Sequence, residues 1–265
     1  MFADLYRYRR YTTIRALGSH LVRIHPFLQI FTFLIPVVAQ IVFWRAVFAN
    51  SGPEIGGYSA GDTILYLIVL KLIMELTWAY EGVIQEDIRY GELTEHLLKP
   101  ASYIKIRYFD NLGTMVTRWM NALILILVVF VFFHGDVRLA SDAWVYPAGL
   151  LSVFLTFQLQ YVFMLCVALL SFWTEGNPPL VEHTSRLFSG ALVPLTFLPA
   201  ALQRLADGLP FKYMLYFPTT VFLGKVTPSD CVSGIFMQVL WIIVLGGVSH
   251  VMWRKGVKRY VAYGG

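Results

Sequence analysis

The sequence predicts an all-α protein that crosses a membrane six times, and three observations support this prediction. Of the 265 residues, 57% are hydrophobic and 14% are charged, whereas soluble domains carry about 25% charged residues. The apolar residues form runs that are long enough to span a bilayer. The Lys and Arg residues gather at the ends of these runs, as the positive-inside rule describes.

Six apolar runs define one predicted membrane domain, which covers residues 26–265. Five of them are plain spans, at about residues 27–47, 63–80, 114–133, 143–173 and 234–253. The other run begins near Leu187, and Pro194, Pro199, Pro210 and Pro218 interrupt it. Proline breaks a regular helix, so we expect a fifth span followed by short re-entrant or interfacial helices before the last span.

The N-terminal segment, residues 1–25, is basic and rich in aromatic residues. It carries five arginines among Phe, Tyr, Leu and Ile residues, a composition typical of a helix that lies on the membrane surface. We therefore predict an N-terminal amphipathic connecting helix there, with a disordered basic tail as the alternative. The apolar stretch that comes next is longer than the core of a signal peptide, so we interpret it as an uncleaved first span.

The distribution of basic residues predicts the orientation. Fifteen of the 21 Lys and Arg residues lie on the side that includes both termini, and five lie on the other side: Arg45, Arg138, Arg204, Lys212 and Lys225. Both termini are therefore expected in the cytoplasm, which requires an even number of spans. The net charge of +5 then indicates contact with anionic lipid head groups and no nucleic-acid partner.

Motifs for catalysis are missing or out of context. The sequence has no phosphate-binding G-x-x-x-x-G-K-[ST] loop, no H-E-x-x-H motif and no Cys/His cluster with metal-ligand spacing. Residues 57–61 match G-x-S-x-G, but that motif needs a turn from a strand into a helix together with His and acidic partners. Because this match lies between two predicted spans, we interpret it as a flexible turn before a helix and predict no catalytic residue and no metal site.

Two sets of polar residues lie within predicted spans. Lys71 and Glu75 are four residues apart and share one face of the second span. We expect either an intramembrane ion pair that fixes packing, or a polar lining of a substrate path or subunit contact. Gln158 and Gln160 in the fourth span are expected to form hydrogen bonds between helices.

The longest polar segment, residues 81–110, lies between the second and third spans. A helix of mixed charge on the cytoplasmic side is a suitable contact for a soluble partner. The alternative is a solvated connector, although connectors that only turn the chain are usually shorter.

Three stretches resemble the membrane-spanning permease subunits of type-2 ATP-binding-cassette (ABC) exporters. The first runs from Asp87 to Leu93 and on to the Leu-Leu-Lys-Pro of residues 97–100. The second is residues 190–199, followed by Leu209-Pro210-Phe211, Pro218 and Gly224. The third is residues 253–256 with the terminal Gly-Gly. Each stretch alone has low specificity, but their order and spacing make the resemblance more specific. Together with the six spans, the resemblance covers nearly the whole chain.

The resemblance implies a permease without ATPase activity of its own, in the inner membrane of a prokaryote. ATP and magnesium would be bound by a separate ABC ATPase subunit, and a second permease, identical or homologous, would complete a dimer. The implied coupling helix, which contacts the ATPase, comprises Gln85, Glu86, Asp87, Ile88, Arg89, Tyr90, Gly91, Glu92 and Leu93. A second cytoplasmic contact comprises Thr174, Glu175, Gly176 and Asn177. The outward re-entrant region comprises Pro194, Phe197, Pro199, Pro210, Phe211 and Pro218.

Within the implied coupling helix, Ile88 and Leu93 are expected to provide apolar anchoring. Glu86, Asp87, Arg89 and Glu92 are expected to provide complementary charges for the ATPase. Two other functions remain open: a secondary transporter of a small amphipathic substrate without an ATPase, and a membrane enzyme. A bound ATPase subunit would separate the first interpretation from both alternatives.

Overall fold

The computed structural model describes residues 25–77, 82–133, 140–174 and 185–260, and they form an all-α fold with one short hairpin. The predicted N-terminal amphipathic helix lies outside the described residues, apart from residue 25. The elements in chain order are α2 (His25–Ser51), β1 (Glu54–Ile55), β2 (Tyr58–Ser59), α3 (Ala60–Thr77), α4 (Gly82–Arg89), α5 (Leu93–Leu97), α6 (Tyr103–Phe133), α7 (Val145–Leu169), η2 (Leu170–Phe172), η3 (Leu195–Phe197), α9 (Ala200–Asp207), η4 (Pro210–Tyr213), α10 (Tyr216–Phe222) and α11 (Pro228–Arg259).

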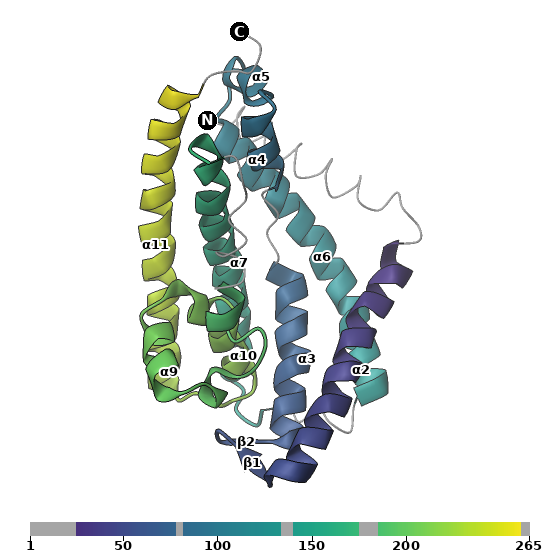
Figure 1. Cartoon of the computed structure of the whole chain (residues 1–265). Helices are drawn as coiled ribbons and strands as arrows, with labels where there is room; N and C mark the ends of the chain where they lie inside the picture. Colours follow the sequence, from purple (N-terminus) through teal and green to yellow (C-terminus); the bar gives the residue numbers. More distant parts are fainter. Residues whose placement is uncertain (1–24, 78–81, 134–139, 175–184, 261–265) are drawn as a thin grey trace.

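Among the described residues, the long helices α2, α3, α6, α7 and α11 form the body, and short elements lie at its two ends (Figure 1). The short helices α4 and α5 lie at the end where α6 begins and α11 finishes. The β1–β2 hairpin and α9 lie at the opposite end. Helix α7 is central, since it contacts α3, α4, α10 and α11.

Three described helices are long and apolar enough to cross a membrane: Phe31–Ser51, Val145–Phe172 and Pro228–Arg259. The number rises to four if α3 and α4, which are bent by 41° relative to each other, count as one broken span. The all-α membrane architecture is therefore confirmed, whereas six separate spans are not. In α6 the apolar part that the structure describes, Ala122–Val131, is shorter than a full span.

Large apolar side chains on α2, α6 and α11 are exposed, which is unusual for a protein surrounded by water. Examples are Ile35 on α2, Leu127 on α6 and Phe236 on α11, each more than 60% exposed. Such a surface suits hydrocarbon, where apolar side chains need no cover.

A buried glutamine joins the two helices with the most extensive contact, α7 and α11. Gln238 on α11 is fully buried. Its Nε2 donates to the carbonyl of Ser152 (3.1 Å), to Thr156 Oγ1 (3.0 Å) and to the carbonyl of Tyr213 (3.0 Å), and its Oε1 accepts from Ser152 Oγ (3.1 Å). The side-chain amide is thereby satisfied away from water, as a buried polar group requires.

Glycines allow aromatic rings to lie directly on the long helices. A Cβ built on Gly234 of α11 would lie 2.1 Å from Phe217 Cε2, and one on Gly256 would lie 2.2 Å from Phe172 Cδ2. A Cβ on Gly149 of α7 would lie 2.7 Å from Phe222 Cζ. Small residues permit such close approach between membrane helices, so these three positions set the packing of α10 and η2 against α7 and α11.

The apolar run after residue 187 is divided into short helices, as the prolines predicted. Pro194 and Pro199 are the residues immediately before η3 and α9, and Pro210 is the first residue of η4. Proline fits these places because the first residues of a helix have no partner for a backbone N–H. Pro218 lies in the first turn of α10.

The β1–β2 hairpin packs on this divided segment. Its turn residues Gly56 (φ 56°) and Gly57 (φ 79°) have the left-handed conformation that a two-residue hairpin turn demands. Ser59 Oγ accepts from the Asp62 N–H (3.1 Å), and Asp62 Oδ2 accepts from the Ser59 N–H (3.2 Å). The serine of the G-x-S-x-G match is therefore a helix cap at the start of α3, in line with its interpretation as a turn.

Two glycine substitutions on α11 should have opposite effects on thermal stability. Gly234→Ala places a methyl group against the buried Phe217 ring, so we expect a loss of about 1–3 kcal/mol. Gly247→Ala is the matched control, because a Cβ there has no neighbour within 4 Å, and it should stabilise the helix by about 0.5–1 kcal/mol. Thermal unfolding of the purified variants in detergent measures both. Equal melting temperatures for the two variants would contradict the packing described for Phe217.

Candidate functional site

Helices α4 and α5 form a bend that is fixed to the long helices by one apolar face. In α4 the buried residues are Ile84, Asp87 and Ile88, a spacing that places them on one helix face. Ile84 and Ile88, with Leu93 of α5, pack against a group on α6, α7 and η2 that includes Tyr103, Tyr161, Leu165 and Leu169. Gly91 makes the turn between α4 and α5 with a φ of 83°, a conformation that favours glycine.

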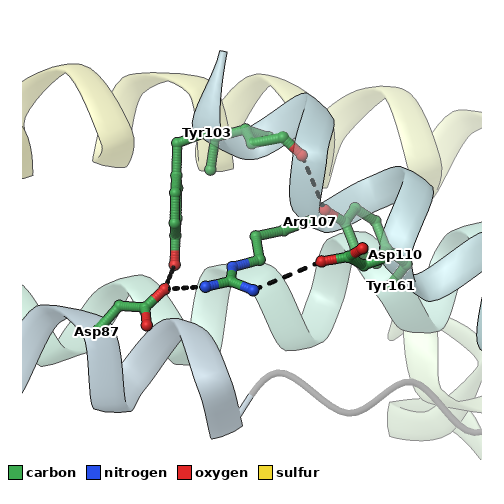
Figure 2. A network of polar contacts seen from close by, with 6 residues as sticks. Asp87, Tyr103, Arg107, Asp110 and Tyr161 are labelled. Atoms are coloured by element: carbon green, nitrogen blue, oxygen red, sulfur yellow. Dashed lines mark hydrogen bonds and ion pairs between the residues drawn. The ribbon is translucent and has the colours of Figure 1, made fainter. Parts of the chain in front are cut away.

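A polar network fixes the same bend to the first turns of α6 (Figure 2). Asp87 Oδ2 accepts hydrogen bonds from the Tyr103 hydroxyl and from Arg107 Nη2, and the Arg107 contact is an ion pair. Arg107 Nη1 also lies 3.5 Å from Asp110 Oδ2, and its guanidinium lies 5.1 Å from the centre of the Tyr103 ring. Asp87 is only 2% exposed, so its charge is balanced within this chain.

These contacts change the expected roles of three residues. Ile88 and Leu93 were expected to anchor the ATPase, and Asp87 to provide charge for it. All three side chains face the core of this chain, because the bend needs them for its own packing. A partner at this surface would instead meet the exposed Glu86, Tyr90 and Glu92.

Other exposed groups extend this surface beyond the residues expected from the sequence. Leu98, immediately after α5, is 82% exposed and Leu97 is 42% exposed, whereas Tyr90, at 73% exposed, was among the expected residues. Gln85 is partly buried. Arg89 Nε and Nη2 are buried and have no hydrogen-bond partner among the described residues. The side chains of Leu97 and Leu98 were missed as site residues, although an apolar pair at the end of a charged segment is a detectable signal.

His96 lies between the exposed surface and the Asp87 network. Its ring is 5.3 Å from the Tyr103 ring in an edge-to-face arrangement. Burial lowers the pKa of His96, and the positive charges of Arg107 and Lys99 lower that pKa further. The imidazole is therefore neutral at pH 7, which keeps another positive charge away from Arg107.

Of the second expected cytoplasmic contact, the structure describes only Thr174. Its side chain is exposed, and its hydroxyl donates to the carbonyl of Leu170 at 3.1 Å. Residues 175–177 lie outside the described residues.

The intramembrane residues Lys71 and Glu75 do not pair with each other. Lys71 has no hydrogen bond or ion pair within the described parts of the chain, although Glu75 is one turn away. Both residues instead line a pocket of about 300 Å³ between α3 and α6, together with Met74 and Arg118. A charge at the centre of a membrane helix costs about 2.5–3.5 kcal/mol on insertion scales, so three charged residues at one place are unusual in an apolar body.

The prediction for Gln158 and Gln160 is confirmed. Gln158 Oε1 accepts from the Tyr108 hydroxyl at 3.0 Å, which joins α7 to α6. Gln160 Nε2 donates to Thr77 Oγ1 at 3.0 Å, which joins α7 to α3. Three long helices are thus connected by side-chain hydrogen bonds in the half of the body nearest α4.

The residues assigned to the re-entrant region gather at the end opposite α4. Phe197 contacts Trp44 of α2 and Tyr58 of β2, with ring centroids 5.4 and 5.9 Å apart. Phe211 lies edge-to-face on Phe163 of α7 at 5.3 Å. These aromatic contacts link η3 and η4 to α2, the hairpin and α7, so this end of the protein is a packed unit.

Replacing Arg107 by Met should destabilise the protein strongly. The change leaves the buried Asp87 carboxylate without its cation, and breaking a buried ion pair in this way costs about 3–5 kcal/mol. Lys105→Met is the matched control, because Lys105 is exposed on the same helix. Thermal unfolding in detergent measures both variants, and Asp87→Asn added to Arg107→Met should recover part of the loss. A melting temperature for Arg107→Met equal to that of Lys105→Met would exclude the proposed role of the network.

Comparison with known proteins identifies the family. The model of the family described as "ABC-2 family transporter protein" matches residues 34–264, and this match includes α4, α5, the polar pocket and the proline-divided segment. The comparisons with curated proteins and with solved structures find no match. Since the family model covers nearly the whole described body, the chain belongs to the ABC-2 family of membrane transporter proteins.

Proposed function

We propose that this chain is the permease subunit of an ABC exporter, and that a separate ATPase subunit docks on the bend formed by α4 and α5. ATP and magnesium would be bound by that ATPase. A secondary transporter that works without an ATPase is not favoured by the family to which the chain belongs. The observation that carries the proposal is a rigid bend with an exposed outer surface, at one end of a membrane-embedded body.

The outer surface of the bend has the chemistry of a protein contact. Tyr90 and Leu98 offer exposed apolar area, and aromatic residues are frequent at the centres of interfaces. Glu86 and Glu92 add exposed negative charges beside them. Thr174, Glu175, Gly176 and Asn177 would form the second contact.

The inner surface of the bend suits the transmission of motion. Ion pairing of Asp87 to Arg107 fixes α4 to α6, and apolar packing of Ile84 and Ile88 fixes it to α7. A movement of the docked ATPase would therefore displace α4, α6 and α7 together. Two such permeases, identical or homologous, would then pass a substrate outward between them.

The distribution of charge supports a cytoplasmic location for the bend. Basic residues near this end include Lys99, Lys105, Arg254, Lys255, Lys258 and Arg259. The opposite end carries Glu54, Asp62, Asp142, Asp207 and Asp230 among fewer basic residues. By the positive-inside rule, this distribution supports a cytoplasmic location for both termini. We propose that the chain has six spans in the inner membrane of a prokaryotic cell. Two of these spans would come from the second half of α6 and from the segment near residue 187, and residues 194–218 would face outward.

Cysteine labelling tests this orientation. In intact cells, a membrane-impermeant maleimide should label Asp142→Cys at the outer end and should not label Glu92→Cys until the cells are permeabilised. Both positions are exposed, so the difference reports the side of the membrane. Labelling of Glu92→Cys in intact cells would contradict a docking site for a cytoplasmic ATPase.

Cross-linking tests the ATPase contact. A photo-reactive amino acid at position 90 should form a cross-link to a nucleotide-binding subunit, whereas the same amino acid at the exposed position Ile243 of α11 should not. Tyr90→Ala should reduce the ATPase activity of the purified complex several-fold, because interface aromatics carry much of the binding free energy. If position 90 gives no such cross-link and Tyr90→Ala keeps full activity, the docking surface is wrong.

A further inference from the structure

The pocket between α3 and α6 is lined by residues that lie away from the ends of both helices. Lys71 is 11 residues after the start of α3, and Arg118 is 15 residues after the start of α6. Met74 and Glu75 complete the lining. At 1.5 Å per residue, Lys71 lies about 16 Å from the start of α3, and Arg118 lies about 22 Å from the start of α6. The two helices start at opposite ends of the body (Figure 1). The pocket therefore lies at an intermediate depth.

The pocket has two basic side chains and one carboxylate. The balance of charge is positive, even when Glu75 neutralises one of the cations. Lys71 makes no hydrogen bond or ion pair with the described residues, so its three N–H donors are available at the pocket. A positive site beside apolar surroundings attracts an anion more strongly than the same site in water, because the local dielectric constant is lower.

The surroundings suit the tail of an amphipathic molecule. Along α6, beyond Arg118 and away from α4, the exposed side chains of the described residues are apolar. Among them, Ile126 is 47% exposed and lies about two turns after Arg118, on the neighbouring part of the helix surface. Met74 adds an apolar and adaptable wall to the pocket itself. An anionic group at Lys71 and Arg118 could thus be continued by a hydrocarbon chain on the surface of α6.

We propose that this pocket binds the anionic head group, a carboxylate or a phosphate, of an amphipathic molecule. Lys71 and Arg118 contact the anion, and Glu75 limits its affinity so that it can be released. The proposal rests on the proposed permease function and adds the chemical class of the substrate. The same chemistry is found in a transported amphiphile and in an anionic membrane lipid.

Binding of a fluorescent fatty acid to the full chain in phosphatidylcholine nanodiscs tests the site. Lys71→Gln and Arg118→Gln should each weaken binding of the acid by about tenfold or more, because each removes a cation next to the carboxylate. Both variants should leave binding of the corresponding alcohol, which has the same tail, unchanged. Glu75→Gln should strengthen binding of the acid several-fold, and it offers a test that does not depend on the removal of a cation.

The matched control is Arg204→Gln, which removes the same charge from an exposed position on α9 and should leave binding unchanged. The proposal is overturned if Lys71→Gln and Arg118→Gln bind the acid as tightly as the unaltered chain. It is also overturned if Lys71→Gln and Arg118→Gln weaken binding of the acid and of the alcohol equally. A Glu75→Gln variant that binds the acid no more tightly than the unaltered chain would overturn it as well.

Nanodiscs that contain phosphatidylglycerol distinguish the two sources of the anion. Competition by this lipid assigns the pocket to a lipid head group, and undiminished binding of the acid assigns it to a separate amphiphile; both outcomes support the site. The proposed function fails separately, when position 90 forms no cross-link to an ATPase. A chain that cross-links to the ATPase but shows no dependence on Lys71 would refute only the pocket.

Discussion

The buried carboxylate of Asp87 is the constraint on which the end of the body that carries α4 and α5 depends. A charge that is 2% exposed must be compensated by a cation and by hydrogen bonds, or the fold loses several kcal/mol. Arg107 and Tyr103 supply this compensation from the first turns of α6. The orientation of α4 is therefore fixed by electrostatics as well as by apolar packing, and the side chains on its other face are left exposed at the surface.

Elsewhere in the body, helices are held together by close packing and by interhelical hydrogen bonds, which do not depend on the hydrophobic effect. In hydrocarbon the apolar faces gain little from association, so close packing and interhelical hydrogen bonds decide which helices adjoin. Gln238, Gln158 and Gln160 provide such bonds between α7 and its neighbours α11, α6 and α3. Glycines under phenylalanine rings provide the close packing, as at Gly234. The exposed apolar faces of α2 and α11 are then suited to hydrocarbon surroundings.

Composition and local rules were enough to predict part of this structure from the sequence. Helices, the division of the chain at Pro194, Pro199 and Pro210, and the interhelical role of the glutamines all depend on properties of single residues. Burial within the bend was not predictable, because the charged residues of α4 have the same periodicity whether they face a partner or the protein. Asp87 and Ile88 were therefore expected to contact a partner, and only the position of α6 shows that Arg107 forms an ion pair with the Asp87 carboxylate. The pocket at Lys71 and Glu75 likewise depends on Arg118, which is distant in sequence.

Helix α6 connects the bend formed by α4 and α5 to the polar pocket. It carries Arg107 beside Asp87 and, 11 residues further along, Arg118 at the polar pocket. A continuous helix transmits displacement along its axis with little loss, and these two residues are separated by about 16 Å of it. Under the proposed function, a shift of the docked α4 would move Arg118 relative to Lys71, which belongs to a different helix. The separation of the two cations, and hence the affinity of the pocket for an anion, would then change with the state of the ATPase, which is what a pump requires of its binding site.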